Sequence, residues 1–130
     1  MQEVYDFLKS CGVYYLATID GEYPRVRPFG TIEIFDNHLY IQTGKKKKVF
    51  EQIEKNSKVE ICAFKDGKWI RVSGELASDN RVEAKKHMLY RYPELREMYN
   101  ELDDNTIVLY FKKGKAVISS FTEKDRIIDF

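Results

Sequence analysis

The stretch VYYLATIDGEYPRVRPFG, from Val13 to Gly30, decides the fold class. Its first part, Val13 to Ile19, is rich in β-branched and aromatic residues and is apolar on both faces, which predicts a central strand. Asp20 and Gly21 then form a turn dipeptide, and a polar and apolar alternation follows Pro24. The chain is therefore expected to open its sheet with two neighbouring strands.

The alternation after Pro24 gives this second segment two different faces. One face carries Arg25, Arg27, Phe29, Thr31 and Glu33, and the other carries Val26, Pro28, Gly30, Ile32 and Ile34. Pro28 and Gly30 are poor interior strand residues, so they indicate a bulge, a bend or a close approach of backbone or ligand. Asp36-Asn37 predicts a turn, and His38 to Thr43 returns as an antiparallel strand.

Four helical segments are expected in addition to the strands. The first carries Val4, Phe7, Leu8 and Cys11 at helical spacing and stops at Gly12. The second carries Val49, Phe50 and Ile53 and should end near Asn56. Asp79 is expected to cap a third helix that runs to about Tyr92. Pro93 begins the fourth, a short helix with Leu95, Met98 and Tyr99.

The remaining segments alternate as strands joined by tight turns. Val59 to Phe64 and Trp69 to Ala77 flank the turn Lys65-Asp66-Gly67-Lys68, and Ile107 to Lys112 and Ala116 to Phe121 flank Lys113-Gly114-Lys115. Tight connections require a mainly antiparallel sheet, and closing it into a barrel removes its edges. The predicted fold is α+β, a barrel of six to seven strands with short flanking helices, and residues 1–130 are predicted to form a single domain.

Composition excludes several classes of protein. The 130 residues are 43% hydrophobic and 14% aromatic, which argues against disorder. The 22 basic and 21 acidic residues leave a net charge of +1, which argues against a broad nucleic-acid or membrane surface. No apolar run approaches the roughly 18 residues of a membrane span, and the first residues lack the pattern of a signal peptide. We expect a soluble, cytoplasmic protein.

The cysteines and histidines predict no metal site. Cys11 and Cys62 lie far apart in the sequence, so they are interpreted as reduced packing residues. His38 falls in a turn and His87 on a helical face, with no second ligand at metal spacing.

The run Lys45 to Lys48 is the most informative polar feature. It can be a solvated helix start, but cations oppose the dipole at a helix N-terminus and repel one another. An anion would relieve both effects, and a phosphate suits the free N–H groups of a helix start. Gly44 would let the backbone approach it. The Walker pattern is absent, so hydrolysis of nucleoside triphosphates is not supported.

Two further features each have a structural and a functional interpretation. Arg25 and Arg27 point the same way and either face solvent or hold a second polar part of the same ligand. Trp69 either packs in a core or interface, or lies against a cofactor. Nothing in the sequence specifies a catalytic acid or base, and Tyr14, Tyr15 and Glu33 are the side chains considered.

Taken in order, GVYYLATIDGEYPRVRPFG, HLYIQTGKKKKVFEQIEKNSKVEIC and WIRVSGEL resemble the pyridoxamine 5'-phosphate oxidase-like family of FMN-binding split barrels. The opening looks most like a short branch that includes the 5-nitroimidazole resistance proteins. The resemblance implies a split-barrel domain, an FMN cofactor, a homodimer, and oxidoreductase activity on a small molecule such as a nitro compound, a quinone or a pyridoxal-like ring.

The resemblance also implies which residues hold the cofactor. The strand at PRVRPF lies along the flavin ring and ribityl chain, which makes Arg25, Arg27, Pro28, Phe29 and Gly30 candidates. Gln42 and Thr43 correspond to residues that touch the flavin, and Lys47 and Lys48 to its phosphate clamp. Trp69 matches a flavin-proximal residue that the second subunit often supplies.

One departure limits what the resemblance implies. The full-length oxidases carry a C-terminal segment with a Trp and an Arg that help to bind flavin and substrate, whereas this sequence ends at DRIIDF. Oxidation of pyridoxamine phosphate is therefore not expected. The alternative is a non-catalytic binding module: a flavin or haem carrier, or a small barrel that grips single-stranded nucleic acid by charge and stacking.

Overall fold

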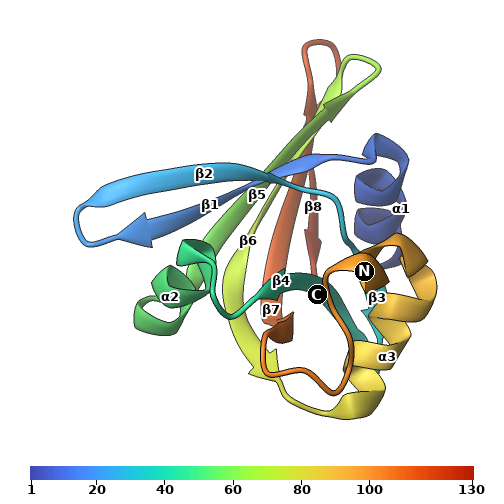
Figure 1. Cartoon of the computed structure of the whole chain (residues 1–130). Coiled ribbons are helices and arrows are strands. Elements are labelled where there is room, and N and C mark those ends of the chain that lie inside the picture. Colours follow the sequence, from blue (N-terminus) through green and yellow to red (C-terminus); the bar gives the residue numbers. More distant parts are fainter.

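The strand-forming segments build one eight-stranded sheet, which three α-helices and a 3-10 helix flank in the computed structural model (Figure 1). The structure describes residues 1–130. The elements are α1 (Gln2–Cys11), β1 (Tyr14–Asp20), β2 (Tyr23–Phe29), β3 (Glu33–Phe35), β4 (His38–Gly44), α2 (Lys48–Lys55), β5 (Lys58–Lys65), β6 (Lys68–Asp79), α3 (Val82–Arg91), η1 (Pro93–Glu97), β7 (Thr106–Ser120) and β8 (Arg126–Asp129).

The sheet is antiparallel at every pair of neighbouring strands. Its order is β2-β1-β5-β6-β7-β4-β3, and β8 pairs with β7 off this path. The two end strands, β2 and β3, do not pair with each other, so the sheet stays unclosed. The predicted α+β fold, a mainly antiparallel split barrel, is confirmed, with eight strands rather than six or seven.

The turn residues identified in the sequence adopt the backbone conformations that tight hairpins need. Asp36 and Asn37 have φ values of 51° and 60°, and Asp66 and Gly67 have values of 52° and 75°. Two consecutive positive φ angles are typical of type I′ turns, whose twist matches that of antiparallel strands. These turns fix the register of the β3–β4 and β5–β6 hairpins.

The helices cover both faces of the sheet. α1 and α2 pack on the inner face, which holds the main core, whereas Ala84 and Met88 of α3 pack with Tyr40 and Val108 on the opposite face of β4 and β7. α1 buries Val4 and Leu8 in the main core, which also contains the inner side chains of β1, β4, β5, β6 and β7. α2 packs against β1 and ends before Asn56, as the sequence predicts. In Figure 1, α1 and α3 lie on one side of the molecule and α2 lies beneath the β1–β2 hairpin.

The two closing strands predicted around Gly114 are wrong. β7 is one strand of 15 residues that runs through this glycine, and β8 was not expected. Gly114 favours a turn in sequence terms, but here it makes room for the ring of Phe130, which a Cβ atom would overlap. Gly114 and Phe130 also exchange two backbone hydrogen bonds, of 2.7 and 2.9 Å.

The prediction that β1 is buried on both faces is also wrong. Tyr14 and Leu16 are buried, but Tyr15 on the opposite side is 52% exposed. We call this opposite side of the sheet the outer face. Its exposed residues include Tyr15, Val26, Pro28, Cys62, Phe64 and Ile127. Cys62 is therefore not buried in the core as a packing residue.

Asp79 does not cap α3. Arg81 occupies the N-cap position, and no side chain caps this helix. The Asp79 carboxylate instead accepts hydrogen bonds from the guanidinium and backbone N–H of Arg81 and from the hydroxyl of Tyr40. The bonds from Arg81 hold the pKa of Asp79 at about 2, while burial and the bond to Asp79 raise the pKa of Tyr40 to about 12.

No helix is both long enough and apolar enough to cross a membrane.

Candidate functional site

A small pocket forms where the chain between β2 and β3, the end of β4 and η1 meet. Its volume is about 160 Å³. It is lined by Pro28, Phe29, Gly30, Thr31, Gln42, Thr43, Lys47, Leu95, Met98 and Tyr99. Six residues implied by the family resemblance therefore share one pocket: Pro28, Phe29, Gly30, Gln42, Thr43 and Lys47.

The first wall is the segment where the chain leaves the sheet. β2 ends at Phe29 and β3 begins at Glu33, so the bend expected from Pro28 and Gly30 is present. The Thr31 hydroxyl accepts a hydrogen bond of 3.0 Å from the backbone N–H of Gln42. This bond fixes the wall against β4. A Cβ at Gly30 would lie 3.7 Å from the Gly12 carbonyl, an ordinary contact, so the fold itself does not require glycine there.

Gln42 lines the pocket and carries a buried amide that has no partner. Its side chain is 5% exposed, and neither Oε1 nor Nε2 has a hydrogen-bond partner. Buried polar side chains are nearly always hydrogen-bonded, because an unpaired group costs about 1–3 kcal/mol. The other buried glutamine follows this rule, since Gln52 Oε1 accepts bonds from Thr18 and Arg27. The amide of Gln42 thus has unused hydrogen-bonding capacity beside the pocket.

Lys47 brings positive charge to the same pocket. It is the N-cap residue of α2, and no side chain caps this helix. The helix therefore offers free N–H groups at this end, next to an exposed ammonium, and both suit an anion.

The loop that carries the lysines is held from the far end of the sequence. The backbone N–H of Lys45 donates to the Asn105 carbonyl (2.7 Å), and that of Lys46 donates to Asn105 Oδ1 (3.0 Å). Gly44 lies so close to Tyr99 and Asn105 that an added Cβ would be 3.1 Å from Tyr99 Oη and from Asn105 Nδ2. The size of Gly44, rather than an unusual φ angle, lets the loop pack here.

Asp103 orders the segment that contains Asn105. Its carboxylate accepts bonds from the N–H groups of Asn100, Asn105 and Thr106 and from the Thr106 hydroxyl. Partial burial raises the pKa of Asp103, but these hydrogen bonds outweigh it and lower the pKa to about 2. Asp103 is thus ionised at neutral pH.

Four residues implied by the resemblance lie outside the pocket. Arg27 donates to Leu16 O, Thr18 Oγ1 and Gln52 Oε1, so its guanidinium lies between β1 and α2. Burial lowers the pKa of Arg27 from its usual value. Arg25 pairs with Asp20 at 3.1 Å, where both side chains are about half exposed.

Lys48 and Trp69 are the other two. Lys48 lines a separate open groove of about 470 Å³ between α2 and the β1–β2 turn. Trp69 lies near the β5–β6 turn, with its ring 5.0 Å from that of Phe121. This turn is one of the two hairpin tips that project from the sheet in Figure 1.

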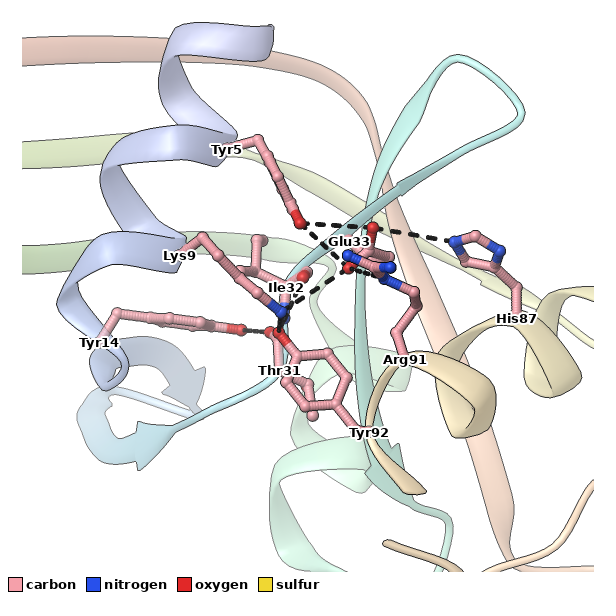
Figure 2. Close-up of polar contacts among 9 residues, drawn as sticks. All are labelled: Tyr5, Lys9, Tyr14, Thr31, Ile32, Glu33, His87, Arg91 and Tyr92. Atoms are coloured by element: carbon pink, nitrogen blue, oxygen red, sulfur yellow. Dashed lines mark hydrogen bonds and ion pairs between the residues drawn. The ribbon is translucent and has the colours of Figure 1, made fainter. Parts of the chain in front are cut away.

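The side chains considered for proton transfer lie away from the pocket. Tyr14 is fully buried and donates to the Thr31 carbonyl, and Tyr15 lies on the outer face. Glu33 is 7% exposed and lies among four polar groups, as Figure 2 shows. The Tyr5 hydroxyl donates to it, and Lys9, His87 and Arg91 lie within 3.9 Å of it.

The second wall was not expected from the sequence as part of the site. Leu95, Met98 and Tyr99 belong to η1 and the residues just after it, and the sequence shows them only as apolar positions of a short helix. They lie about 50 residues beyond Gln42, and no local pattern indicates that the two segments meet. No group of three or more His, Cys, Asp or Glu side chains is placed to hold a metal ion.

Comparisons with known proteins agree with this architecture. A family model described as pyridoxamine 5'-phosphate oxidase matches residues 1–108. The chain is similar to a NimC/NimA family protein from Clostridium acetobutylicum, at 43% identity over 100% of this chain and 92% of the other, with a TM-score of 0.97. No curated protein matches the chain.

More distant structures share the fold alone. General Stress Protein 26 from Bacillus anthracis is 17% identical, over 98% of each chain, with a TM-score of 0.74. A pyridoxamine 5'-phosphate oxidase-related, FMN binding protein from Nostoc punctiforme is 14% identical, over 97% of this chain and 90% of the other, with a TM-score of 0.63.

Proposed function

Because the chain belongs to the pyridoxamine 5'-phosphate oxidase family, we propose that it is a flavoprotein that binds FMN and acts as an oxidoreductase on a small molecule. One relative with this fold is described as FMN binding, which supports the choice of cofactor. The substrate class that we propose is a nitro compound, a quinone or a pyridoxal-like ring.

The unpartnered amide of Gln42 is the observation that carries this proposal. Gln42 lines the same pocket as Lys47, so an unused hydrogen-bonding group and a positive charge lie beside one ligand site. FMN has both matching parts, a ring system with polar edges and a phosphate. The residues present therefore fit the cofactor.

The size of the pocket indicates how much of the cofactor it takes. A volume of about 160 Å³ is below the ~300–1,000 Å³ of typical small-molecule sites. The pocket therefore encloses only part of FMN. The rest must lie against a surface that one copy of the chain does not enclose.

Lys47 and Lys48, with the N–H groups that begin α2, bind the phosphate. Gln42 and Thr43 bind the flavin from β4. From β2, the ring and ribityl chain are contacted by Arg25, Pro28, Phe29 and Gly30. Arg27 acts indirectly, because its bonds to Thr18 and Gln52 hold α2 against β1.

Bound FMN supplies electron or hydride transfer, and the protein supplies placement and electrostatics. The exposed ammonium of Lys47 balances the phosphate charge, and the amide of Gln42 orients the cofactor. The side chains of Leu95 and Met98 add apolar surface to one side of the pocket. No side chain of this chain is assigned a catalytic proton transfer.

We propose a homodimer that completes the site. The outer face exposes large apolar side chains, with Val26 67%, Phe64 64% and Tyr15 52% exposed. Large exposed apolar side chains gathered on one face are typical of protein interfaces. A second copy packed on the outer face would also bring its Trp69 toward the flavin.

We further propose that residues 1–130 form one domain and that the protein is cytoplasmic.

The test measures FMN and riboflavin binding by the purified protein, from the flavin absorbance spectrum and from fluorescence titration. We expect FMN to bind at micromolar concentration or below. Lys47→Ala should lower the affinity for FMN about tenfold. This is the lower end of the effect of losing a charge-assisted hydrogen bond, because the ammonium is exposed. The affinity for riboflavin, which has no phosphate, should stay the same.

Lys46→Ala is the matched control. This lysine is also exposed and is adjacent in sequence, but it does not line the pocket. If both variants lose FMN equally, the effect is that of general charge and the phosphate site lies elsewhere. If wild-type protein binds neither flavin but binds haem or the deazaflavin F420, the proposed cofactor is wrong.

A further inference from the structure

We propose that Tyr92 is a positioning residue that sets the spacing between the two walls of the pocket. This inference rests on the proposed function, since it assigns a role to that same site. Tyr92 is the residue between α3 and η1. Figure 2 shows its ring reaching across to the chain between β2 and β3.

The hydroxyl of Tyr92 makes three hydrogen bonds. It donates to the Ile32 carbonyl (2.9 Å) and accepts from the Ile32 N–H (3.1 Å) and from Lys9 Nζ (2.7 Å). A phenol has one donor and two acceptor positions, so this group is fully used. Its ring also lies under the Lys9 ammonium, 4.1 Å from the ring centroid.

These bonds replace sheet pairing at a place where the chain has left the sheet. Ile32 is 1% exposed, so its backbone polar groups are out of reach of water. The next residue back, Thr31, lines the pocket, and the hydroxyl of Tyr14 holds its carbonyl. Tyr92 and Tyr14 thus hold the first wall from behind.

The backbone of Tyr92 holds the second wall. Its carbonyl accepts the N–H of Leu95, and the Leu95 carbonyl accepts the N–H groups of Met98 and Tyr99, all at 2.9–3.0 Å. Leu95, Met98 and Tyr99 line the same pocket as Thr31. One residue therefore connects both walls, through its side chain on one side and its main chain on the other.

Loss of the hydroxyl would move the walls rather than leave a simple gap. Both polar groups of Ile32 would be buried without a partner, which is strongly unfavourable. The segment would shift until water or another group satisfied them. Thr31 would shift with it, and the distance to η1 would change.

The test compares Tyr92→Phe, which keeps the ring, with Tyr5→Phe. Both variants remove one hydroxyl from the same group of contacts between α1, β3 and α3. Tyr5 donates to Glu33 but has no bond to Ile32 or to η1. Tyr90→Phe is a second control, because Tyr90 is 78% exposed on α3. Melting temperature measures the structural effect of each change.

Amide hydrogen exchange in the flavin-free protein is the first measurement. Tyr92→Phe should accelerate exchange about tenfold or more at Ile32 and at the amides of Leu95, Met98 and Tyr99. The controls should leave these four amides unchanged. Unchanged exchange at either wall in Tyr92→Phe overturns the inference. This measurement does not depend on whether FMN is the ligand.

FMN affinity and the circular dichroism of bound flavin are the second measurement. Tyr92→Phe should weaken FMN about tenfold and alter the flavin signal, whereas Tyr5→Phe should stay within about twofold at a similar melting temperature. An equal loss of FMN affinity in both variants would mean that Tyr92 acts only through the stability of the fold, and it would overturn the inference. If Tyr92→Phe does not fold, Lys9→Met removes one of the three bonds and should give the same pattern in weaker form.

Discussion

Replacing Gln42 by Leu should raise the stability of the flavin-free protein and lower its affinity for FMN. The buried amide has no partner within the chain, and such a group costs about 1–3 kcal/mol. Leu has a similar volume and no polar atoms, so the substitution should relieve about 1 kcal/mol or more of this free energy. For a domain of this size, that is a rise in melting temperature of about 3–6 °C.

Gln52→Leu is the matched control, since Gln52 is also buried, at 8% exposed. Its Oε1 accepts 2.6 and 2.7 Å bonds from Thr18 and Arg27. The same substitution there removes two bonds and leaves their donors unpaired, so it should destabilise the protein by about 2–3 kcal/mol.

The assay combines thermal melting without flavin and FMN titration. Gln42→Leu should bind FMN roughly tenfold more weakly, the loss of one or two hydrogen bonds to the ligand. A fall in melting temperature as large as that of Gln52→Leu would refute the reasoning, because it would show that the Gln42 amide is already satisfied. Unchanged FMN affinity would separate this amide from the ligand.

Three other substitutions test separate parts of the structure. Gly44→Ala adds a Cβ 3.1 Å from Tyr99 and Asn105, so thermal melting should show a loss of about 1 kcal/mol or more. Because hydrogen bonds lower the pKa of Asp103 from 3.8 to about 2, its contribution to stability is complete above pH ~4 and is lost as pH falls toward 2. Asp103→Asn should flatten that part of a stability curve measured by denaturant unfolding. Val26→Glu places a charge on the outer face and should weaken self-association in analytical ultracentrifugation, without lowering stability by more than about 0.5 kcal/mol.

Local chemistry made much of the fold predictable. α1 and α2 follow apolar spacing, and the turns at Asp36-Asn37 and Asp66-Gly67 follow residue types that tolerate positive φ. Gly114 misled the prediction because glycine in a sequence indicates backbone freedom. Here its function is to leave space for Phe130, a residue that a local pattern does not connect with it.

The candidate site was predictable only in part. The resemblance placed Gln42 and Thr43 together with Lys47, which are close in sequence and lie in one pocket. The wall formed by Leu95 and Met98 depends on how α3 folds back across β3, and a pattern within a short window does not contain that information. The unpartnered state of the Gln42 amide is likewise a three-dimensional property.

The pairing of β4 with β7 also sets the order in which the pocket can be assembled during synthesis. Gly44 lies opposite Thr106, about 60 residues later in the chain. At a translation rate of ~5–20 residues per second, β4 waits about 3–12 s for its partner. Asn105, which holds the lysine loop, arrives in the same segment. The loop that carries the lysines is therefore completed late, and a nascent chain presents an apolar β4 that has no partner on this side until β7 emerges.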